Sequence, residues 1–483
     1  MSWQVMSGLR GALRRRNLSG LRYWEVEMDG DLKTGSQIAG LTCELATRAA
    51  TLQYADLPEP VREVARQCVL DYLGVAVAGA GDPLVGMLLD EMAEAGGAAQ
   101  ASIVGHKERL PALSAALVNG AAGHALDFDD VNVAMPGHPT VAVLPGLLAL
   151  AEMLGSSGRD VLTAFVAGYE TECRIGAAMG PGHYDLGFHS TATIGTLGAA
   201  AACARLLGLD ADQTATALGI AGTQAAGLKS EFGTMCKPFH AGKAAQNGLL
   251  AARLAARGFS SRTDLVECVQ GFAATHGPDF APEKALAEPE GGWHILANLF
   301  KYHAACYFTH APIECARELR RAHNLTPERI AAITLRIDRS TDRVCNIPSP
   351  VDGLESKFSL RQTVAMALAG VDTANLGAYS EANARDPGLV ALRQRLSFDF
   401  QKGWPQTLGE IDIELDDGRQ VSARHDSGIP AADIAGQGRR LAAKFDTLVG
   451  PVLGAPRARE LREAVAALDG FADIGALTGL AAS

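Results

Sequence analysis

The hydrophobic positions of this chain follow two different periods. Between residues 58 and 257 they recur every three or four residues, the spacing of helices that bury one face. The pattern predicts a helix from Val61 after a proline-marked start, followed by helices at 84–95, 110–125, 139–154, 159–178, 190–206, 211–224 and 237–257. Alanine and glycine are so dense in 190–206 and 211–224 that we expect closely packed backbones in a buried helical core.

From about residue 296 the pattern changes, after a loop-like stretch at 271–295. β-branched residues alternate with polar ones at 333–338 and 411–415, which predicts strands, and Asp416-Asp-Gly-Arg predicts a hairpin turn into a further strand. The last fifty residues return to the helical period. We therefore expect them to rejoin the first domain.

These elements predict a mainly α fold. A large all-helical domain is built from residues 38–290 and 431–483 and is discontinuous, and a smaller α+β domain at 291–430 is inserted between its parts. The length of 483 residues favours two domains, and the low aromatic content with abundant alanine and glycine favours packed helices over a β-sandwich.

Composition excludes several classes of partner. A formal net charge of -11, without a basic stripe, argues against nucleic acid, so an anionic ligand would need a local positive cluster. No apolar run is long enough to predict a membrane span. Nine dispersed cysteines without CxxC or zinc spacing indicate reduced thiols, so we expect a cytoplasmic protein.

Residues 1–37 are expected to lie outside the fold. Five arginines precede the first acidic residue, Glu25. This composition is compatible with a transit peptide and equally with an extended start, and the sequence leaves the choice open.

The densest chemistry lies in the connection 123–139. It places Asp127, Asp129 and Asp130 between His124 and His138, just after one predicted helix and just before another. Loops on a rigid scaffold commonly carry catalytic residues, and imidazoles with carboxylates suit proton transfer. A solvated, capped loop is the alternative.

A second candidate is the start of the helix at 190–206. Ser190 or Thr191 can cap it, which would leave His189 beside free N–H groups where a substrate carboxylate is favoured. The alternative is a cap with an incidental histidine.

Two further groups are basic. Lys237, His240 and Lys243 recur at a spacing of three and share a helix face, and their apolar neighbours indicate a partly buried lysine rather than a solvated face. In the α+β domain, His303, His310 and Lys357 are candidates to reach a cleft.

Six ordered motifs resemble the MmgE/PrpD family, which contains 2-methylcitrate dehydratase, cis-aconitate decarboxylase and iminodisuccinate epimerase. The resemblance runs from about residue 40 to about 450 and rests on these segments: HALDFDD, GHPTVAVLPGLLALAE, GYETECRIG, GFHSTATIGTLGAAAACARLLGLD, GTMCKPFHAGKAAQNG and SKFSL. It implies a helical domain built from both chain ends, an inserted α+β lid, a cleft at their junction, a homodimer, and no metal or organic cofactor.

The resemblance also implies the site. By position it assigns catalytic roles to Asp127, His138, His189 and Lys237. The expected substrate-binding residues are His124, Ser190, Thr191, His240, His303 and Lys357. The sequence departs from the family pattern at Val131, a threonine in the decarboxylase, in a spacing to His138 that is one residue longer, and at His303, where a proline is expected.

All three activities develop negative charge on a carbon next to a carboxylate. Cations must stabilise that charge, and a group that titrates near neutrality must move the proton. We expect Lys237 to do the first and His138 with His189 the second, with Asp127 orienting one imidazole.

We therefore expect a cofactor-independent lyase acting on a di- or tricarboxylate, and we place a 2-methylcitrate dehydratase-like hydro-lyase first. A cis-aconitate decarboxylase-like carboxy-lyase or an iminodisuccinate epimerase-like isomerase comes next. A non-catalytic scaffold that kept the fold is a further alternative.

Overall fold

The computed structural model of the protein describes residues 13–18, 21–26 and 40–482. The chain divides into two compact units, 1–39 and 40–483. In the first unit, strands β1 (Leu13–Leu18) and β2 (Leu21–Val26) form an antiparallel pair that the sequence pattern did not predict. Most of the segment expected outside the fold, and the choice between a targeting segment and an extended start, fall outside the described residues.

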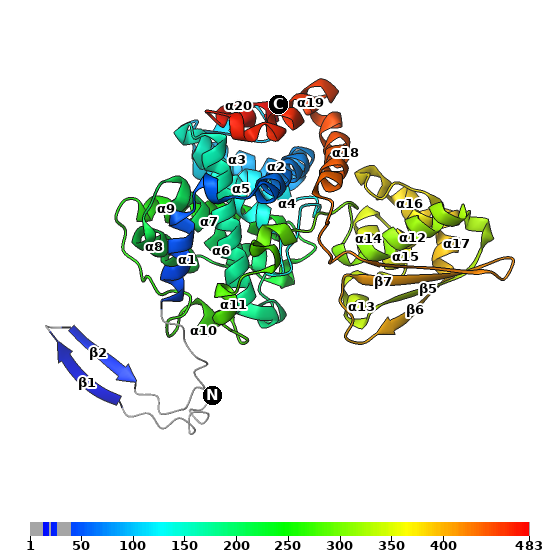
Figure 1. Ribbon diagram of the computed structural model, residues 1–483, viewed down its shortest axis with the longest axis horizontal. Coiled ribbons are helices and arrows are strands. Elements are labelled where there is room, and N and C mark those ends of the chain that lie inside the picture. The colour runs from blue at the N-terminus through cyan, green and yellow to red at the C-terminus, as the bar shows by residue number, and fades with distance from the viewer. Residues whose placement is uncertain (1–12, 19–20, 27–39, 483) are drawn as a thin grey trace. The chain divides into compact units, whose positions relative to one another are not determined.

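The second unit is mainly helical, which confirms the mainly α part of the predicted fold class (Figure 1). Its first part contains α1 (Leu41–Thr51), α2 (Glu59–Gly79), α3 (Pro83–Ala95), α4 (Ala112–His124), α5 (Pro139–Leu154), α6 (Gly158–Asp185), α7 (Ser190–Leu206), α8 (Ala211–Gly222), α9 (Cys236–Ala255), α10 (Phe272–His276) and α11 (Glu283–Leu286). A two-residue β pair, β3 (Ala101–Ser102) with β4 (Arg109–Leu110), precedes α4. The long helices lie where the periodicity predicts them.

Small residues let these helices approach closely. A Cβ atom added to Gly195 of α7 would lie 2.5 Å from the Cβ of Ala142 in α5, and one added to Gly120 of α4 would lie 2.7 Å from the Cα of Gly242 in α9. Real side chains do not tolerate such distances. The glycines therefore allow the backbones that carry the site to pack against one another.

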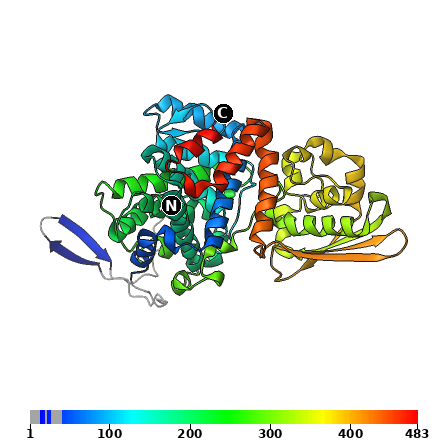
Figure 2. The same cartoon turned by 45° about the horizontal axis from the view of Figure 1, so that its top comes forward.

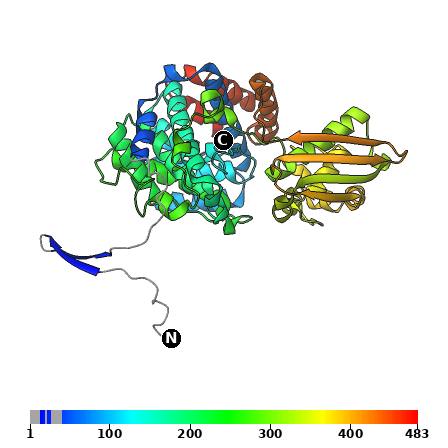
Figure 3. The ribbon, with the colours of Figure 1, turned by 60° about the horizontal axis from the view of Figure 1, so that its bottom comes forward.

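The chain from residue 310 to 426 forms an α+β region with its own apolar core. The helices are α12 (His310–His323), α13 (Asp342–Cys345), α14 (Gly353–Lys357), α15 (Leu360–Ala369), α16 (Glu381–Arg385) and α17 (Pro387–Gln394). The strands are β5 (Ile330–Asp338), β6 (Leu396–Gln401), β7 (Leu408–Leu415) and β8 (Gln420–Asp426). They make one sheet in the order β6-β5-β7-β8, with only β5 and β6 parallel, and helices cover one of its faces (Figure 3).

The C-terminal helices return to the first core. They are α18 (Ile434–Leu453), α19 (Ala455–Ala466) and α20 (Gly475–Ala481), and apolar residues of all three belong to the core of the first helices. In the three ribbon views α18 lies between the helical part and the α+β region (Figures 1, 2 and 3). Leu448 of this helix packs into the core of the α+β region.

Three local predictions differ from the structure. Helix α6 runs past the predicted end at residue 178, with a kink at Gly180, whose φ of 66° is readily adopted by glycine. Strand β6 was not predicted, although Leu396, Phe398 and Phe400 alternate with polar residues. The stretch 271–295 contains the short helices α10 and α11 rather than loop alone.

Among the described residues, no single helix has the length and apolar character to cross a membrane. Helices α2 and α3 together pass such a test by length and composition, but a bend of 88° separates them.

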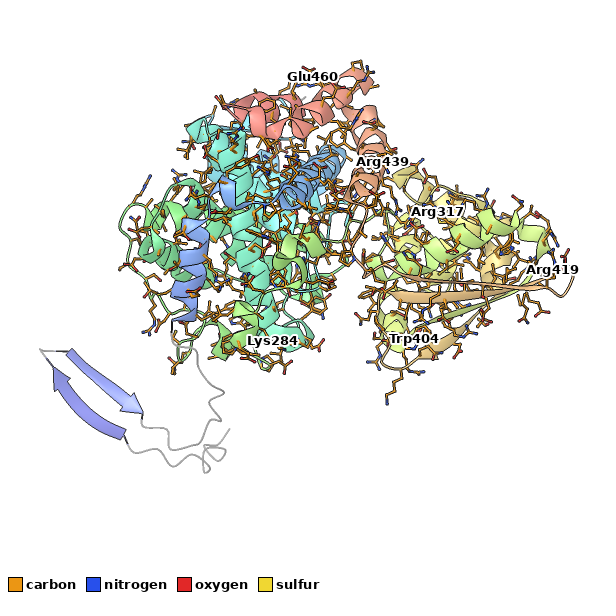
Figure 4. The ribbon with its side chains drawn as sticks, in the orientation of Figure 1. Lys284, Arg317, Trp404, Arg419, Arg439 and Glu460 are labelled. Carbon is orange, nitrogen blue, oxygen red and sulfur yellow. The ribbon has the colours of Figure 1, made fainter. Side chains whose placement is uncertain are left out.

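Figure 4 shows the side chains of the second unit. The labelled Arg419 lies at the tip of the β7–β8 hairpin.

Candidate active site

The connection between α4 and α5 is held in one shape by buried polar contacts. Asp130 accepts a hydrogen bond from the Thr140 hydroxyl and one of 2.9 Å from the Asn298 amide. Val131 pairs through its backbone with Leu299. These contacts fix the loop from both sides, and burial raises the pKa of Asp130 to about 7.

Asp127 lies at the point where two ammonium groups converge. Its Oδ1 is 2.7 Å from Nζ of Lys237 and 2.9 Å from Nζ of Lys301. Burial alone would raise the pKa of this carboxyl, but Lys237 and Lys301 hold it well below its usual range. The backbone of Asp127 is left-handed, with φ of 50°, a conformation that aspartate tolerates better than most residues.

The two lysines come from different parts of the chain. Lys237 lies in the first turn of α9, and Lys301 lies in the segment that leads into the α+β region. Lys301 is almost fully buried. Burial lowers its pKa, but the charges of Asp127 and Asp129 outweigh this effect and raise it, so the side chain stays protonated.

Asp129 is the carboxylate that faces the imidazoles. Both of its oxygens lie 2.9 Å from Nδ1 of His124, and Oδ2 lies 3.2 Å from Nδ1 of His138, a short approach without hydrogen-bond geometry. Burial alone would raise the pKa of Asp129, but the two histidines hold it well below its usual range. Burial lowers the pKa of His124 to about 4, although Asp129 opposes the shift. His124 is therefore neutral near pH 7 with its proton directed at Asp129.

His138 lies between the two aspartates. Its Nε2 is 3.7 Å from Oδ1 of Asp127, the oxygen that the lysines share. The His138 backbone N–H donates a 3.0 Å hydrogen bond to Oγ1 of Thr191, which ties the start of α5 to the start of α7. An imidazole and a pair of ammonium groups thus meet at one carboxylate oxygen.

His189 completes the cluster. Its ring stacks on His124 with centroids 5.9 Å apart and packs edge-on against Phe232 at 4.9 Å. Its Nδ1 lies 3.1 Å from Nδ1 of His240, which projects from α9 one turn after Lys237. Burial, followed by the neighbouring charges of His124 and Lys237, holds the pKa of His189 well below its usual range, so the imidazole is neutral.

The helix-cap prediction at α7 was wrong. The N-cap residue is His189 itself, and no side chain caps the helix. Ser190 and Thr191 lie inside the first turn and are fully buried. Thr191 holds His138, and the hydroxyl of Ser190 has no hydrogen-bond partner among the described residues.

The three candidates of the α+β region differ in their placement. His310, the first residue of α12, is buried with its ring against that of His303. Both ring nitrogens of His303 are engaged inside that region, with Glu314 at 3.2 Å and Thr373 at 2.8 Å. Burial lowers the pKa of Lys357, and the nearby charge of Asp127 opposes that shift. The structure therefore places Lys357 within electrostatic reach of the cluster and engages His303 elsewhere.

Of the predicted residues, the structure brings together Asp127, His138, His189, Lys237, His124, His240 and Thr191. Sequence reasoning did not select Lys301 and assigned Asp129 no catalytic or substrate-binding role. The sequence did contain a signal for Lys301. This lysine stands between two aromatic residues, Phe300 and Tyr302, just as Lys237 stands among apolar neighbours.

Geometry alone would allow a metal ion in this cluster. Four residues each offer a ligand atom within 4.8 Å of the others: His124, Asp127, Asp129 and His138. The donor set argues against one. Asp127 already faces two ammonium groups, which repel a cation, and Asp129 already faces two imidazoles.

Comparison with known proteins covers nearly the whole chain. The model of the MmgE/PrpD N-terminal domain matches residues 43–285, and that of the MmgE/PrpD C-terminal domain matches residues 303–470. A cis-aconitate decarboxylase of Aspergillus terreus is 29% identical over 92% of this chain and 96% of its own length. The human cis-aconitate decarboxylase is 29% identical over 81% of this chain and 84% of its own. A cis-aconitate decarboxylase-like protein of Aspergillus oryzae is 32% identical over 60% of this chain and 63% of its own.

Proposed function

This chain belongs to the MmgE/PrpD family, and from that premise we propose that it is a lyase that removes CO2 from a tricarboxylate of the cis-aconitate type. The similarity to cis-aconitate decarboxylases over almost the full length of both chains supports this choice. It reverses the order expected from the sequence, where a 2-methylcitrate dehydratase-like reaction came first.

The observation that carries the proposal is the pair of ammonium groups on one oxygen. Lys237 and Lys301 both lie within 3 Å of Oδ1 of Asp127, next to Nε2 of His138. A substrate carboxylate has the same charge and geometry as the aspartate side chain. It can therefore bind beside or in place of Asp127 and be held by both cations.

Decarboxylation breaks a carbon–carbon bond and leaves its electron pair on the carbon. An adjacent carboxylate delocalises that charge, and Lys237 with Lys301 stabilises it electrostatically. A proton must then reach the carbon. His138 and His189 are the groups that can hold or deliver it, and the carboxylate of Asp129 lies closer to the imidazole of His138 than that of Asp127 does.

The proposal extends to the assembly of the protein. The α+β region acts as a lid over a helical domain made from both ends of the chain, and the protein works as a homodimer in the cytoplasm without a metal or organic cofactor. The substrate binders include Lys357 from the lid.

Hydro-lyase and epimerase activities on related polycarboxylates use the same kind of proton-transfer groups and form the second candidate. The non-catalytic scaffold makes a different prediction, because a scaffold exchanges no carbon-bound protons.

The purified protein should be incubated with cis-aconitate, 2-methylcitrate, citrate and iminodisuccinate in deuterated water and followed by NMR. We expect loss of one carboxylate from cis-aconitate, with deuterium at a carbon of the product. Dehydration of 2-methylcitrate without decarboxylation would restore the hydro-lyase assignment, and no exchange with any compound would support the scaffold.

His138→Ala and His189→Ala should each abolish turnover while the far-ultraviolet circular dichroism spectrum stays unchanged. Wild-type turnover in either variant would remove that histidine from the mechanism. EDTA should leave the rate unchanged, and inhibition that added divalent metal reverses would contradict the metal-free proposal.

A further inference from the structure

The contact between His189 and His240 joins two imidazoles by their Nδ1 atoms. The two atoms are 3.1 Å apart, the distance of a hydrogen bond. Burial lowers the pKa of both rings, and both are therefore neutral near pH 7. A neutral imidazole carries one N–H, so one of the two Nδ1 atoms donates and the other accepts.

The surroundings leave His189 little freedom. Its backbone N–H donates a 3.0 Å hydrogen bond to the carbonyl oxygen of Gly227, and Phe232 covers its ring edge-on. A Cβ atom added to Gly227 would lie 3.4 Å from the His240 ring and 2.4 Å from the Cβ of Ala192, so this position has no room for a larger residue. The backbone at Gly227 therefore lies beside both histidines and helps to fix their positions.

The second ring nitrogen of His189 has a different environment. Among the described residues, Nε2 of His189 has no hydrogen-bond partner, and it is not one of the fully buried unpaired atoms. It is the ring atom left for a substrate. Its protonation is set at the opposite nitrogen, because the proton of a neutral ring sits on one nitrogen or the other.

We propose that His240 is a positioning residue that donates its Nδ1–H to Nδ1 of His189 and so keeps the His189 proton on Nε2. His189 is then the proton donor of the site. His138 has a different neighbour at this position, because its Nδ1 lies 3.2 Å from a carboxylate oxygen of Asp129 and not near a second imidazole.

The direction of this hydrogen bond rests on the proposed function, since a decarboxylase must deliver a proton to carbon. The charged and titratable groups that act on the pair are His124, His138, Lys237 and Glu231. Glu231 is the acidic residue in this set, and its charge opposes the lowering of the pKa of His240.

The first test is spectroscopic and needs no turnover. In protein labelled with 15N-histidine, two-bond 1H–15N correlation spectra distinguish the Nε2–H tautomer from the Nδ1–H tautomer, and His189→Gln identifies the signals of His189. We expect wild-type His189 as the Nε2–H tautomer and His240 as the Nδ1–H tautomer. The reverse pair of tautomers would overturn the proposal.

The second test uses two substitutions of similar size. His240→Leu removes the donor, and we expect kcat to fall about 10- to 100-fold, part of what a positioned acid contributes, with KM changed less than about threefold. The His189 signal should then show both tautomers. His240→Asn places an amide N–H near the lost donor and should recover about tenfold of the kcat.

His323→Leu and His323→Asn, on the exposed surface of α12, are the matched controls and should behave as wild type. Wild-type kcat in His240→Leu would overturn the proposal. Equal loss in His240→Leu and His240→Asn would also overturn it, because size rather than hydrogen bonding would then matter. If the wild type converts no polycarboxylate, the proposed function fails, and the tautomer spectra still decide which ring donates.

Discussion

Lys301 contacts Asp127 twice, through a 2.6 Å hydrogen bond to the backbone carbonyl oxygen and a 2.9 Å contact with Oδ1. Lys237 contacts the carboxylate oxygen only. Lys301 therefore fixes the left-handed backbone of Asp127 and also balances the charge of its carboxylate. Lys237 only balances that charge.

Lys237→Met and Lys301→Met should each lower kcat/KM about 100- to 1000-fold, because each removes a cation that faces the developing negative charge. Lys301→Met should also reduce the free energy of unfolding by about 1–3 kcal/mol, since it leaves the partly buried carbonyl oxygen of Asp127 unpaired. Steady-state kinetics and urea denaturation measure the two effects. Lys284→Met, at an exposed position labelled in Figure 4, is the control, and equal stability of the two lysine variants would contradict the dual role of Lys301.

Asp129 and Asp130 are neighbours with different tasks. Asp129→Asn should lower kcat about 100-fold or more, because the neutral amide removes the negative charge that the imidazoles of His124 and His138 face. Asp130→Asn should change kcat less than about fivefold and lower the free energy of unfolding by about 1–3 kcal/mol through its contacts with Thr140 and Asn298. A larger kcat effect for Asp130→Asn would reverse this assignment.

Lys444 of α18 joins that helix to Asp71 of α2 by a buried ion pair and to the loop at 123–139 by a hydrogen bond. Nζ of Lys444 on α18 lies 2.6 Å from Oδ1 of Asp71 and donates a 2.7 Å hydrogen bond to the carbonyl oxygen of Phe128. Lys444→Met should lower the free energy of unfolding by about 3–5 kcal/mol, because it leaves a carboxylate buried without its partner. The double variant Asp71→Leu with Lys444→Met should recover part of this loss in urea melts. The single variant Asp71→Leu completes the comparison. If the double variant loses as much stability as Lys444→Met and Asp71→Leu lose together, the two side chains are not coupled.

His183 makes stability depend on pH. Its ring nitrogens contact the carbonyl of His276 and the hydroxyl of Thr193, and burial lowers its pKa from 6.5 to about 4. Between these values the unfolded chain binds the proton and the folded chain does not. Stability is therefore complete above pH 6.5 and falls as the pH drops towards 4, by about 3 kcal/mol for this group.

Urea denaturation at several pH values between 4 and 7 should show this slope in the wild type and a shallower one in His183→Gln. The exposed His323→Gln should keep the wild-type slope. An unchanged slope in His183→Gln would mean that the ring is charged in the folded protein.

Much of the fold could be predicted because its signals are local. The periodicity of apolar positions located α2 to α9, and the alternation near Ile333 and Ile411 located β5 and β7. Strand β6 was missed, since a short strand gains its stability from pairing with β5, which lies more than fifty residues away.

The candidate site was predicted in part for the same reason. Asp127, His138, His189 and Lys237 stand in motifs that a single sequence displays. The roles of Asp129 and Lys301 were missed because they depend on contacts between distant segments, with Lys301 following Asp129 by more than 170 residues.

The sequence by itself determined the helical architecture, the family and the ionisable groups of the loop at 123–139, because periodicity and motifs are properties of neighbouring residues. The tertiary structure alone decided which carboxylate faces the lysines and which faces the imidazoles. That division depends on distances of about 3 Å between side chains from α4, α7, α9 and the Lys301 segment. Charge interactions in a buried site are strong at such distances and weak a few ångströms further away.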